Sequence, residues 1–160
     1  MYKVLIPQDI QEEGKQYLRE KGYEIQIGSG FDRDTLKKEI SDADAVIART
    51  AAYPADVIAA GTKLKVIARY GVGYDNIDLK AAEDMGIYVT IAKGCNTRSV
   101  AEHTAALMLA CARNITQIYE ELKRGNFAIR NALPGMELRG KTFGIAGMQE
   151  SPKRIHCQIF

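Results

Sequence analysis

The segment RYGVGYDNID (69–78) places two glycines two positions apart, directly after the short apolar run KVIAR (65–69). If that run is a parallel β-strand, the glycines lie beyond its carboxyl end, where ligands of open α/β sheets bind. Backbone N–H groups that point into such a turn can hold an anion, and a carboxylate is the natural guest. Gly71, Val72 and Gly73 are therefore candidates for binding a small carboxylate.

A second segment, ARTAAYP (48–54), ends another strand-like run and is expected on the same rim. There Arg49 can face an acidic ligand, and Thr50 can donate a hydrogen bond to it. The alternative is a solvated arginine and an ordinary loop threonine. A structural alternative also exists for the glycine segment, namely a tight turn in which Asp75 or Asn76 caps the next helix. A single GxG does not decide between these interpretations.

The elements that must position these residues follow from the hydrophobic pattern. Short β-branched runs alternate with amphipathic stretches over the first ninety residues, which indicates parallel strands joined by crossover helices. We predict a doubly wound α/β sheet with flavodoxin-like layering. The expected strands are 3–6, 23–27, 44–48, 65–69 and 87–91, and the expected helices are 10–21, 33–40, 54–60 and 79–85.

A different element begins at Ser99, which is a plausible N-cap with Glu102 three residues later as a capping box. The helix that follows is apolar on nearly every side as far as Ile118, so we expect it to be buried on several sides. After a loop-rich connection, KTFGIAG (141–147) predicts a sixth strand that enters a glycine turn.

Composition limits the class of protein. With 160 residues, the chain can hold one complete domain and a fragment of another. Its 46% hydrophobic and 26% charged residues are typical of a globular protein, and a net charge of +2 gives no support to nucleic-acid binding. The three cysteines lack CxxC spacing, so no zinc site is expected. Without a membrane span or a signal-peptide pattern, a cytoplasmic protein is expected.

Three blocks of sequence, in this order and spacing, resemble the D-isomer-specific 2-hydroxyacid dehydrogenases, most closely the phosphoglycerate-dehydrogenase-like members. The blocks are RYGVGYDNIDLKAAEDMGIYVT (69–90), NTRSVAEHTAALMLACARNI (96–115) and LRGKTFGIAG (138–147). The resemblance implies an oxidoreductase that acts on the CH–OH group of a small 2-hydroxy acid, for which 3-phosphoglycerate is one candidate.

The resemblance also implies a domain organisation. Residues 1–97 would form the flavodoxin-like substrate domain, and residues 98–147 the first helix and strand of a truncated NAD-binding Rossmann domain. Residues 148–160 depart from the family and form an aberrant tail. A reading-frame slip, a truncation and a genuine short form all explain such a tail.

Roles for individual residues follow from the same resemblance. The loop 71–73 would hold the substrate carboxylate through its backbone amides, and Arg49 and Thr50 would form part of the pocket wall. Thr104 and Gly147 would lie along the NAD cofactor. The substrate would be a small 2-hydroxy or 2-oxo acid.

The dinucleotide fingerprint GxGxxG departs from the family at its last two glycines. If Gly147 is the first glycine, Gln149 and Pro152 occupy the positions of the second and third, and both oppose binding of the pyrophosphate. The catalytic Arg, Glu and His of the family lie beyond this loop, and neither His103 nor His156 matches that context. We therefore assign no catalytic residue and expect the chain alone to be inactive and not to bind NAD.

Two other classes of protein share features with this sequence. The long helix from Ser99 resembles the part of the family that forms a dimer interface, so an interaction module that pairs with itself or with a full-length homologue is the alternative function. A homodimer or a larger assembly is expected in either case. A flavodoxin or receiver-like module shares the layering, but the turn after the first strand, PQDIQEEG (7–14), lacks a phosphate-binding loop.

Overall fold

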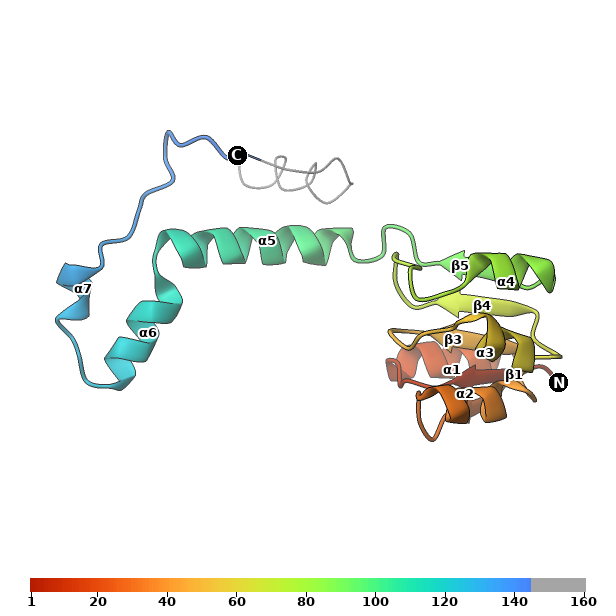
Figure 1. Cartoon of the computed structure of the whole chain (residues 1–160). Coiled ribbons are helices and arrows are strands. Elements are labelled where there is room, and N and C mark those ends of the chain that lie inside the picture. The colour runs from red at the N-terminus through yellow and green to blue at the C-terminus, as the bar shows by residue number, and fades with distance from the viewer. Residues whose placement is uncertain (145–160) are drawn as a thin grey trace. The chain divides into compact units, whose positions relative to one another are not determined.

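The computed structural model describes residues 1–144. The chain divides into two units, of which the first is Met1–Cys95 and the second begins at Asn96. The first unit contains the sheet with its helices, and the second contains a run of helices and loops (Figure 1).

The first unit is built on a five-stranded sheet in which every neighbouring pair of strands is parallel. The spatial order β2-β1-β3-β4-β5 is the flavodoxin-like order, so the predicted doubly wound sheet is confirmed. Each strand begins within one residue of its predicted start. The strands are β1 (Lys3–Ile6), β2 (Glu24–Ile27), β3 (Ala45–Ala48), β4 (Val66–Arg69) and β5 (Tyr88–Ile91).

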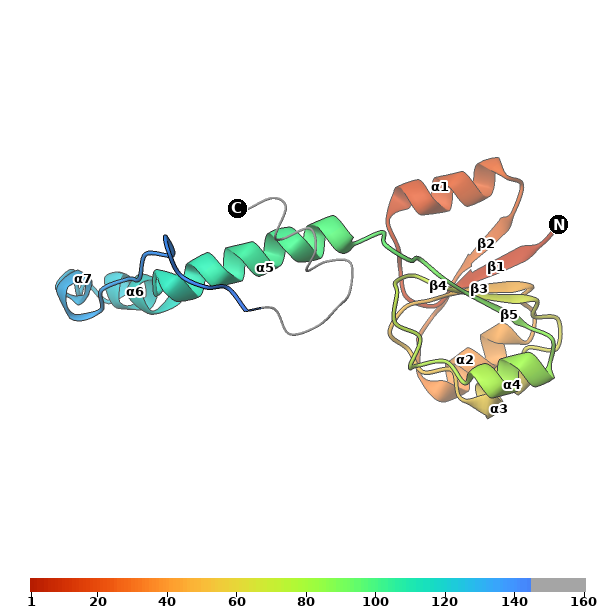
Figure 2. The same cartoon turned by 90° about the horizontal axis from the view of Figure 1, so that it is seen from above.

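Four helices connect these strands, and they cover the two faces of the sheet unequally. Figure 2 shows α2, α3 and α4 together on one face, whereas α1 lies on the other. The helices are α1 (Glu12–Glu20), α2 (Arg33–Ile40), α3 (Ala55–Ala60) and α4 (Leu79–Asp84). All four occur where the sequence predicts them.

The core lies between the sheet and the three-helix layer. Val46 of β3 and Ile67 of β4 are fully buried there, because alternate residues of a strand point to the same face. The helices contribute equally buried apolar side chains, namely Leu36, Ile40, Val57 and Ile58. Towards the α1 face, Ala45 and Val66 are only half-buried, and Tyr88 at the edge is 77% exposed.

Local signals in the sequence explain where these helices begin and end. Gly22 and Gly86 follow α1 and α4 with positive φ angles of 80° and 68°, a backbone conformation that glycine adopts without strain. The Asp32 side chain caps α2 by accepting a hydrogen bond from the N–H of Thr35 at 3.1 Å. Pro54 lies at the N-cap of α3, one position before its predicted place in the first turn.

The second unit corrects the prediction of a single long helix that begins after Ser99. α5 (Thr97–Ala112) begins earlier, with Asn96 at its N-cap, so the proposed capping box is wrong. The helix also stops before its predicted end, and α6 (Ile115–Lys123) starts after a break at Asn114.

Asn114 explains the break. Its φ of 51° is the left-handed conformation, which ends a right-handed helix and which asparagine tolerates better than most residues. Its side chain donates to the carbonyl oxygen of Pro134 at 3.2 Å and so ties the break to the following loop. A short helix, α7 (Ile129–Ala132), lies between α6 and this loop.

The helix α5 was expected to be buried on several sides, but its apolar side chains differ in exposure. The apolar side chains Leu107 and Leu109 of α5 are exposed, whereas Ala101 and Ala112 are buried. Residues 141–144 do not form a strand, and the remaining three residues of the predicted sixth strand lie outside the described residues.

No helix within residues 1–144 combines the length and the apolar character needed to cross a membrane.

The unequal burial of two leucines provides a test of this core. Replacing the fully buried Leu36 by alanine should lower the free energy of unfolding by about 2–5 kcal/mol, because it leaves a cavity beneath α2. The same substitution at Leu79, which is 43% exposed, should cost about 1 kcal/mol or less. Urea titration followed through the amide resonances of residues 1–95 measures both. Equal losses would contradict the assigned core.

Candidate anion-binding site

The parallel register brings three loops to one edge of the sheet. Ala48, the last residue of β3, is paired with Arg69, the last residue of β4. β1 lies on the other side of β3 and ends at Ile6. The chain segments that follow these strands therefore leave the sheet side by side, at the carboxyl edge where open α/β sheets bind ligands.

The glycine turn after β4 has a specific backbone conformation. Gly71 has a φ of 151°, and its N–H donates to the carbonyl oxygen of Arg69 at 2.8 Å. Its own carbonyl oxygen accepts from the N–H of Ala92 at 2.9 Å. Among residues 1–144, the N–H groups of Val72 and Gly73 have no backbone or side-chain acceptor, and Val72 is 46% exposed. Of the three amides predicted to bind an anion, two are therefore available.

Arg69 is a candidate residue that sequence reasoning missed. Its Nη1 donates to the carbonyl oxygen of Tyr70 at 2.6 Å, which folds the guanidinium back over the turn. A Cβ atom on Gly71 would lie only 2.7 Å from the same Nη1. The Nε of Arg69 is buried and has no partner among the described residues. The signal in the sequence was an arginine two positions before the first glycine of the turn.

Arg49 lies at the end of β3 and is held by two neighbours. Its Nη1 donates to the backbone carbonyl oxygen of Asp9 at 2.6 Å, and its guanidinium lies 5.8 Å from the ring centroid of Tyr70. Such stacking of a cation on an aromatic face is favourable. The Asp9 carboxylate accepts from Lys15 at 3.1 Å, and this hydrogen bond holds the pKa of Asp9 below its usual value.

Two side-chain amides bind the backbone of segment 49–51, one at its N–H groups and the other at its carbonyl oxygens. The Oε1 of Gln8 accepts from the N–H groups of Thr50 and Ala51 at 2.9 and 2.8 Å, and its Nε2 donates to the Oγ1 of Thr50 at 2.9 Å. The Nδ2 of Asn76 donates to the carbonyl oxygens of Arg49 and Ala51 at 3.1 and 2.6 Å. The segment that carries the predicted pocket-wall residues is therefore fixed through its backbone.

The alternative interpretation of the glycine segment, in which Asp75 or Asn76 caps the next helix, is wrong. Neither Asp75 nor Asn76 caps α4, because Asp78 is the N-cap and accepts from the N–H of Ala81 at 3.0 Å. The carbonyl oxygen of Asn76 instead accepts from the N–H of Tyr53 at 2.7 Å. Tyr53 is buried, and burial raises the pKa of its phenol.

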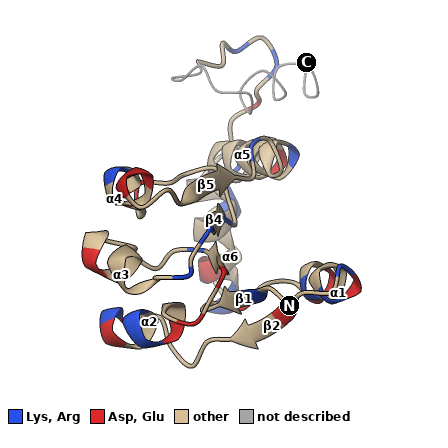
Figure 3. Ribbon diagram, turned by 90° about the vertical axis from the view of Figure 1, so that its right-hand side faces the viewer, with Lys and Arg blue, Asp and Glu red and all other residues tan. Residues whose placement is uncertain are grey.

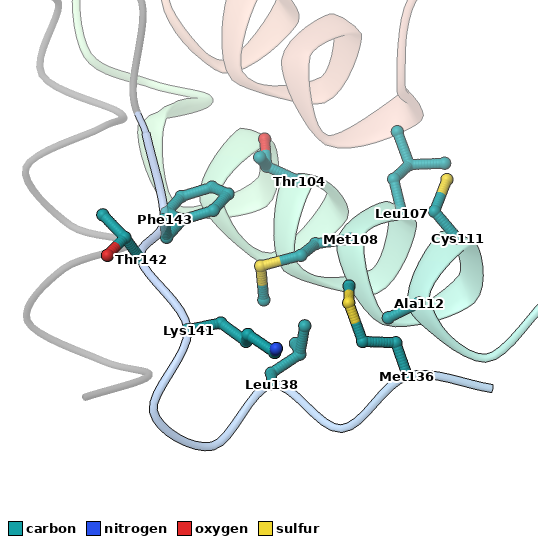
Figure 4. A pocket seen from close by; sticks show the side chains of 10 residues that line it. All are labelled: Thr104, Leu107, Met108, Cys111, Ala112, Met136, Leu138, Lys141, Thr142 and Phe143. Carbon is teal, nitrogen blue, oxygen red and sulfur yellow. The ribbon is translucent and has the colours of Figure 1, made fainter.

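Of the two residues assigned to a cofactor by resemblance, only Thr104 belongs to the described part of the chain. The hydroxyl of Thr104 donates to the carbonyl oxygen of Val100 at 2.7 Å, and Gly147 lies outside the described residues. Thr104 borders an apolar groove of about 550 Å³ between α5 and the segment 136–143. Figure 4 shows Met108, Met136 and Leu138 turned into this space.

The helices that flank the sheet carry charges of both signs. Figure 3 shows Lys or Arg and Asp or Glu side by side on α1 and α2, so neither helix carries a single sign of charge. Ion pairs account for several of these residues, including Arg33 with Asp56 at 2.7 Å.

Within residues 1–144, no group of three or more His, Cys, Asp or Glu side chains is arranged to hold a metal ion.

The open parallel sheet in the order β2-β1-β3-β4-β5 defines an α/β domain of the kind whose ligands lie at the carboxyl edge of the sheet. The sequence matches the family D-isomer specific 2-hydroxyacid dehydrogenase, catalytic domain, over residues 4–138. The chain therefore belongs to this family.

Individual relatives agree with this assignment. The chain is 44% identical over 147 residues to a D-3-phosphoglycerate dehydrogenase of Archaeoglobus fulgidus, a match that covers 91% of this chain and 28% of that protein. It is 41% identical to a hydroxypyruvate reductase of Thermotoga maritima, a match that covers 96% of this chain and 51% of that protein. The chain thus spans between about a quarter and a half of the length of these relatives.

A solved structure also aligns with both units. The NAD-dependent formate dehydrogenase of Staphylococcus aureus in complex with NAD has a TM-score of 0.83 and 27% identity to this chain. The alignment covers 99% of this chain and 53% of that one. The fold is thus shared with about half of that dehydrogenase.

The two glycines of the turn should respond differently to substitution. Alanine at Gly71 is expected to lower the free energy of unfolding by about 1–3 kcal/mol, because L-residues rarely adopt its φ and the Cβ would contact the Arg69 guanidinium. Alanine at Gly73 should cost less than about 0.5 kcal/mol, since its Cβ would meet only Asp75, at 3.7 Å. Urea titrations of the two variants measure this difference, and equal costs would contradict the described turn.

Proposed function

We propose that this chain supplies the substrate-carboxylate site of an NAD-dependent D-2-hydroxyacid dehydrogenase. The observation that carries the proposal is the pair of unpartnered N–H groups at Val72 and Gly73, on the carboxyl edge of the sheet. The substrate class is a small 2-hydroxy or 2-oxo acid. The names of the relatives favour 3-phosphoglycerate and hydroxypyruvate as candidates.

The surroundings of these two amides support a weak anion site. Arg69 is the last residue of β4, and Arg49 directly follows the adjacent strand β3, so two positive charges belong to this edge of the sheet. Asp75 belongs to the same turn, and its negative charge opposes the ligand. Because the turn is exposed, each charged contact is worth about 1 kcal/mol or less. These contributions are consistent with binding in the millimolar range.

We further propose that these 160 residues do not transfer hydride by themselves. Reduction of a 2-oxo acid needs a proton donor for the forming hydroxyl and a cation that orients the carbonyl. The two histidines of the chain, His103 and His156, do not match the context of the family's catalytic histidine. Gln149 and Pro152 replace glycines of the dinucleotide fingerprint, which opposes binding of the pyrophosphate.

Titration with D-glycerate tests the carboxylate site. We expect the amide resonances of Val72 and Gly73 to shift, with a dissociation constant of roughly 1–10 mM, or about −4 kcal/mol at the tight end. The substitution Gly73→Val should abolish these shifts, because a branched side chain would stand beside both amides, whereas Gly73→Ala should weaken binding only severalfold. NAD added to the same sample should shift no resonance.

Two results would count against this proposal. Shifts that persist in the Gly73→Val variant, or that arise elsewhere on the sheet, would show that the turn is only structural. Saturable binding of NAD with a micromolar constant would contradict the proposed lack of cofactor binding.

A second candidate function is self-association through the second unit. On α6, the apolar residues Ile115, Tyr119 and Leu122 recur at helical spacing and are all exposed. The apolar groove beside α5 belongs to the same unit. Exposed apolar surface of this kind often marks a protein–protein contact. A partner surface of the same kind, on a second copy of this chain, would cover it.

Sedimentation at tens of micromolar tests this assembly. We expect a dimer or a larger species, and we expect Tyr119→Lys to shift it towards the monomer because a charge would enter the apolar contact. Tyr17→Lys is the control, since Tyr17 is equally exposed but lies on α1. A monomer in the unaltered protein, or equal effects of the two substitutions, would argue against self-association through α6.

A further inference from the structure

Hydrogen-bond chemistry determines how the side chain of Gln8 is oriented. Two backbone N–H groups, of Thr50 and Ala51, point at one of its terminal atoms. Because an N–H can only donate, that atom must be the amide oxygen. The amide nitrogen therefore faces the hydroxyl oxygen of Thr50, 2.9 Å away, and must be the donor in that contact.

This orientation has a consequence for the hydroxyl of Thr50. Its oxygen accepts from Gln8, so its own hydrogen is not used in that contact and can be donated to another group. Thr50 is exposed and follows β3 by two residues, and the last residue of β3, Ala48, is paired with Arg69, from which the chain continues into the glycine turn. An anion has only acceptors to offer, and a hydroxyl fixed as a donor is therefore complementary to it.

We propose that Gln8 is a positioning residue that fixes Thr50 as a hydrogen-bond donor towards an anion at the Val72–Gly73 amides. The inference rests on the proposed carboxylate site and deepens it. Asn76 supports the arrangement from the other side, because it binds the carbonyl oxygens of Arg49 and Ala51 while Gln8 binds the N–H groups. With the backbone held in both ways, segment 49–51 keeps the Thr50 hydroxyl at the rim.

The substitution Gln8→Glu separates orientation from structural support. A carboxylate still accepts from the N–H groups of Thr50 and Ala51, so the loop stays attached. It has no hydrogen to donate, however, so the Thr50 hydroxyl must turn round and donate to it. The hydroxyl then no longer offers its hydrogen to an anion, although the backbone of the loop keeps its place.

The first arm of the test needs no ligand. The side-chain amide protons of Gln8 are observed directly by NMR in the full chain. We expect Thr50→Val to move one of these two proton resonances upfield and to speed its exchange with water, because its acceptor is gone. Thr50→Ser retains the oxygen and should leave both resonances nearly unchanged. If Thr50→Val changes neither signal, Gln8 does not donate to Thr50 and the inference is wrong.

The second arm is a double-mutant cycle with D-glycerate at pH 7. Gln8→Glu and Thr50→Val should each weaken binding about five- to tenfold, since each removes one hydrogen bond to a charged ligand. Combining them should weaken binding no more than about twofold beyond Thr50→Val alone, because Gln8 acts through Thr50. An equal loss from Gln8→Glu in both backgrounds would mean that the added charge repels the ligand, and would overturn the inference.

The two experiments distinguish failure of the carboxylate site from failure of the role of Gln8. If D-glycerate shifts no resonance of the unaltered protein, the carboxylate site itself is contradicted. The ligand-free arm still decides whether Gln8 donates to Thr50. If the unaltered protein binds and Gln8→Glu binds equally well, the site is supported and the role of Gln8 is refuted.

Discussion

The parallel pairing of β3 with β4 is the interaction on which the rest of the first unit depends. The same register that buries Val46 and Ile67 against the helices also places Ala48 beside Arg69 at the edge of the sheet. A slip of one residue would turn every side chain of a strand to the opposite face. The core would then lose its apolar residues, and the two loops would no longer leave the sheet together. Packing and site geometry are therefore enforced by one constraint.

Side-chain amides fasten the loops that this register brings together. A loop at the rim of a sheet has backbone N–H and C=O groups that no neighbouring strand can satisfy, and each needs a partner where water is excluded. Gln8 and Asn76 provide these partners for segment 49–51, one mainly as an acceptor and the other as a donor. The glycine turn differs, because Val72 and Gly73 keep free N–H groups at the surface. The backbone of segment 49–51 is hydrogen-bonded, whereas two N–H groups of the glycine turn are not, and this difference makes the turn a candidate for ligand binding.

The sequence was sufficient for the sheet but only partly sufficient for the rim. Strands and helices of the first unit follow hydrophobic periodicity, which depends on near neighbours, and their predicted positions agree with the structure. The helix break at Asn114 was missed because apolar residues continue past it, and one left-handed residue leaves little trace in such a pattern. Gln8 was missed for another reason, since its partner Thr50 is 42 positions away. Local spacing cannot report a contact that only the folded sheet creates.

That separation along the chain also bears on when the binding edge comes into existence. Contacts between distant residues carry the entropic cost of closing the chain between them, which slows their formation. The Gln8–Thr50 contact requires β3 to have docked beside β1, and β2 and two helices lie between these two strands in the sequence. A partly folded chain thus has the residues of the rim without its geometry. A ligand that recognises this edge should stabilise the native state alone, and should slow unfolding far more than it speeds folding.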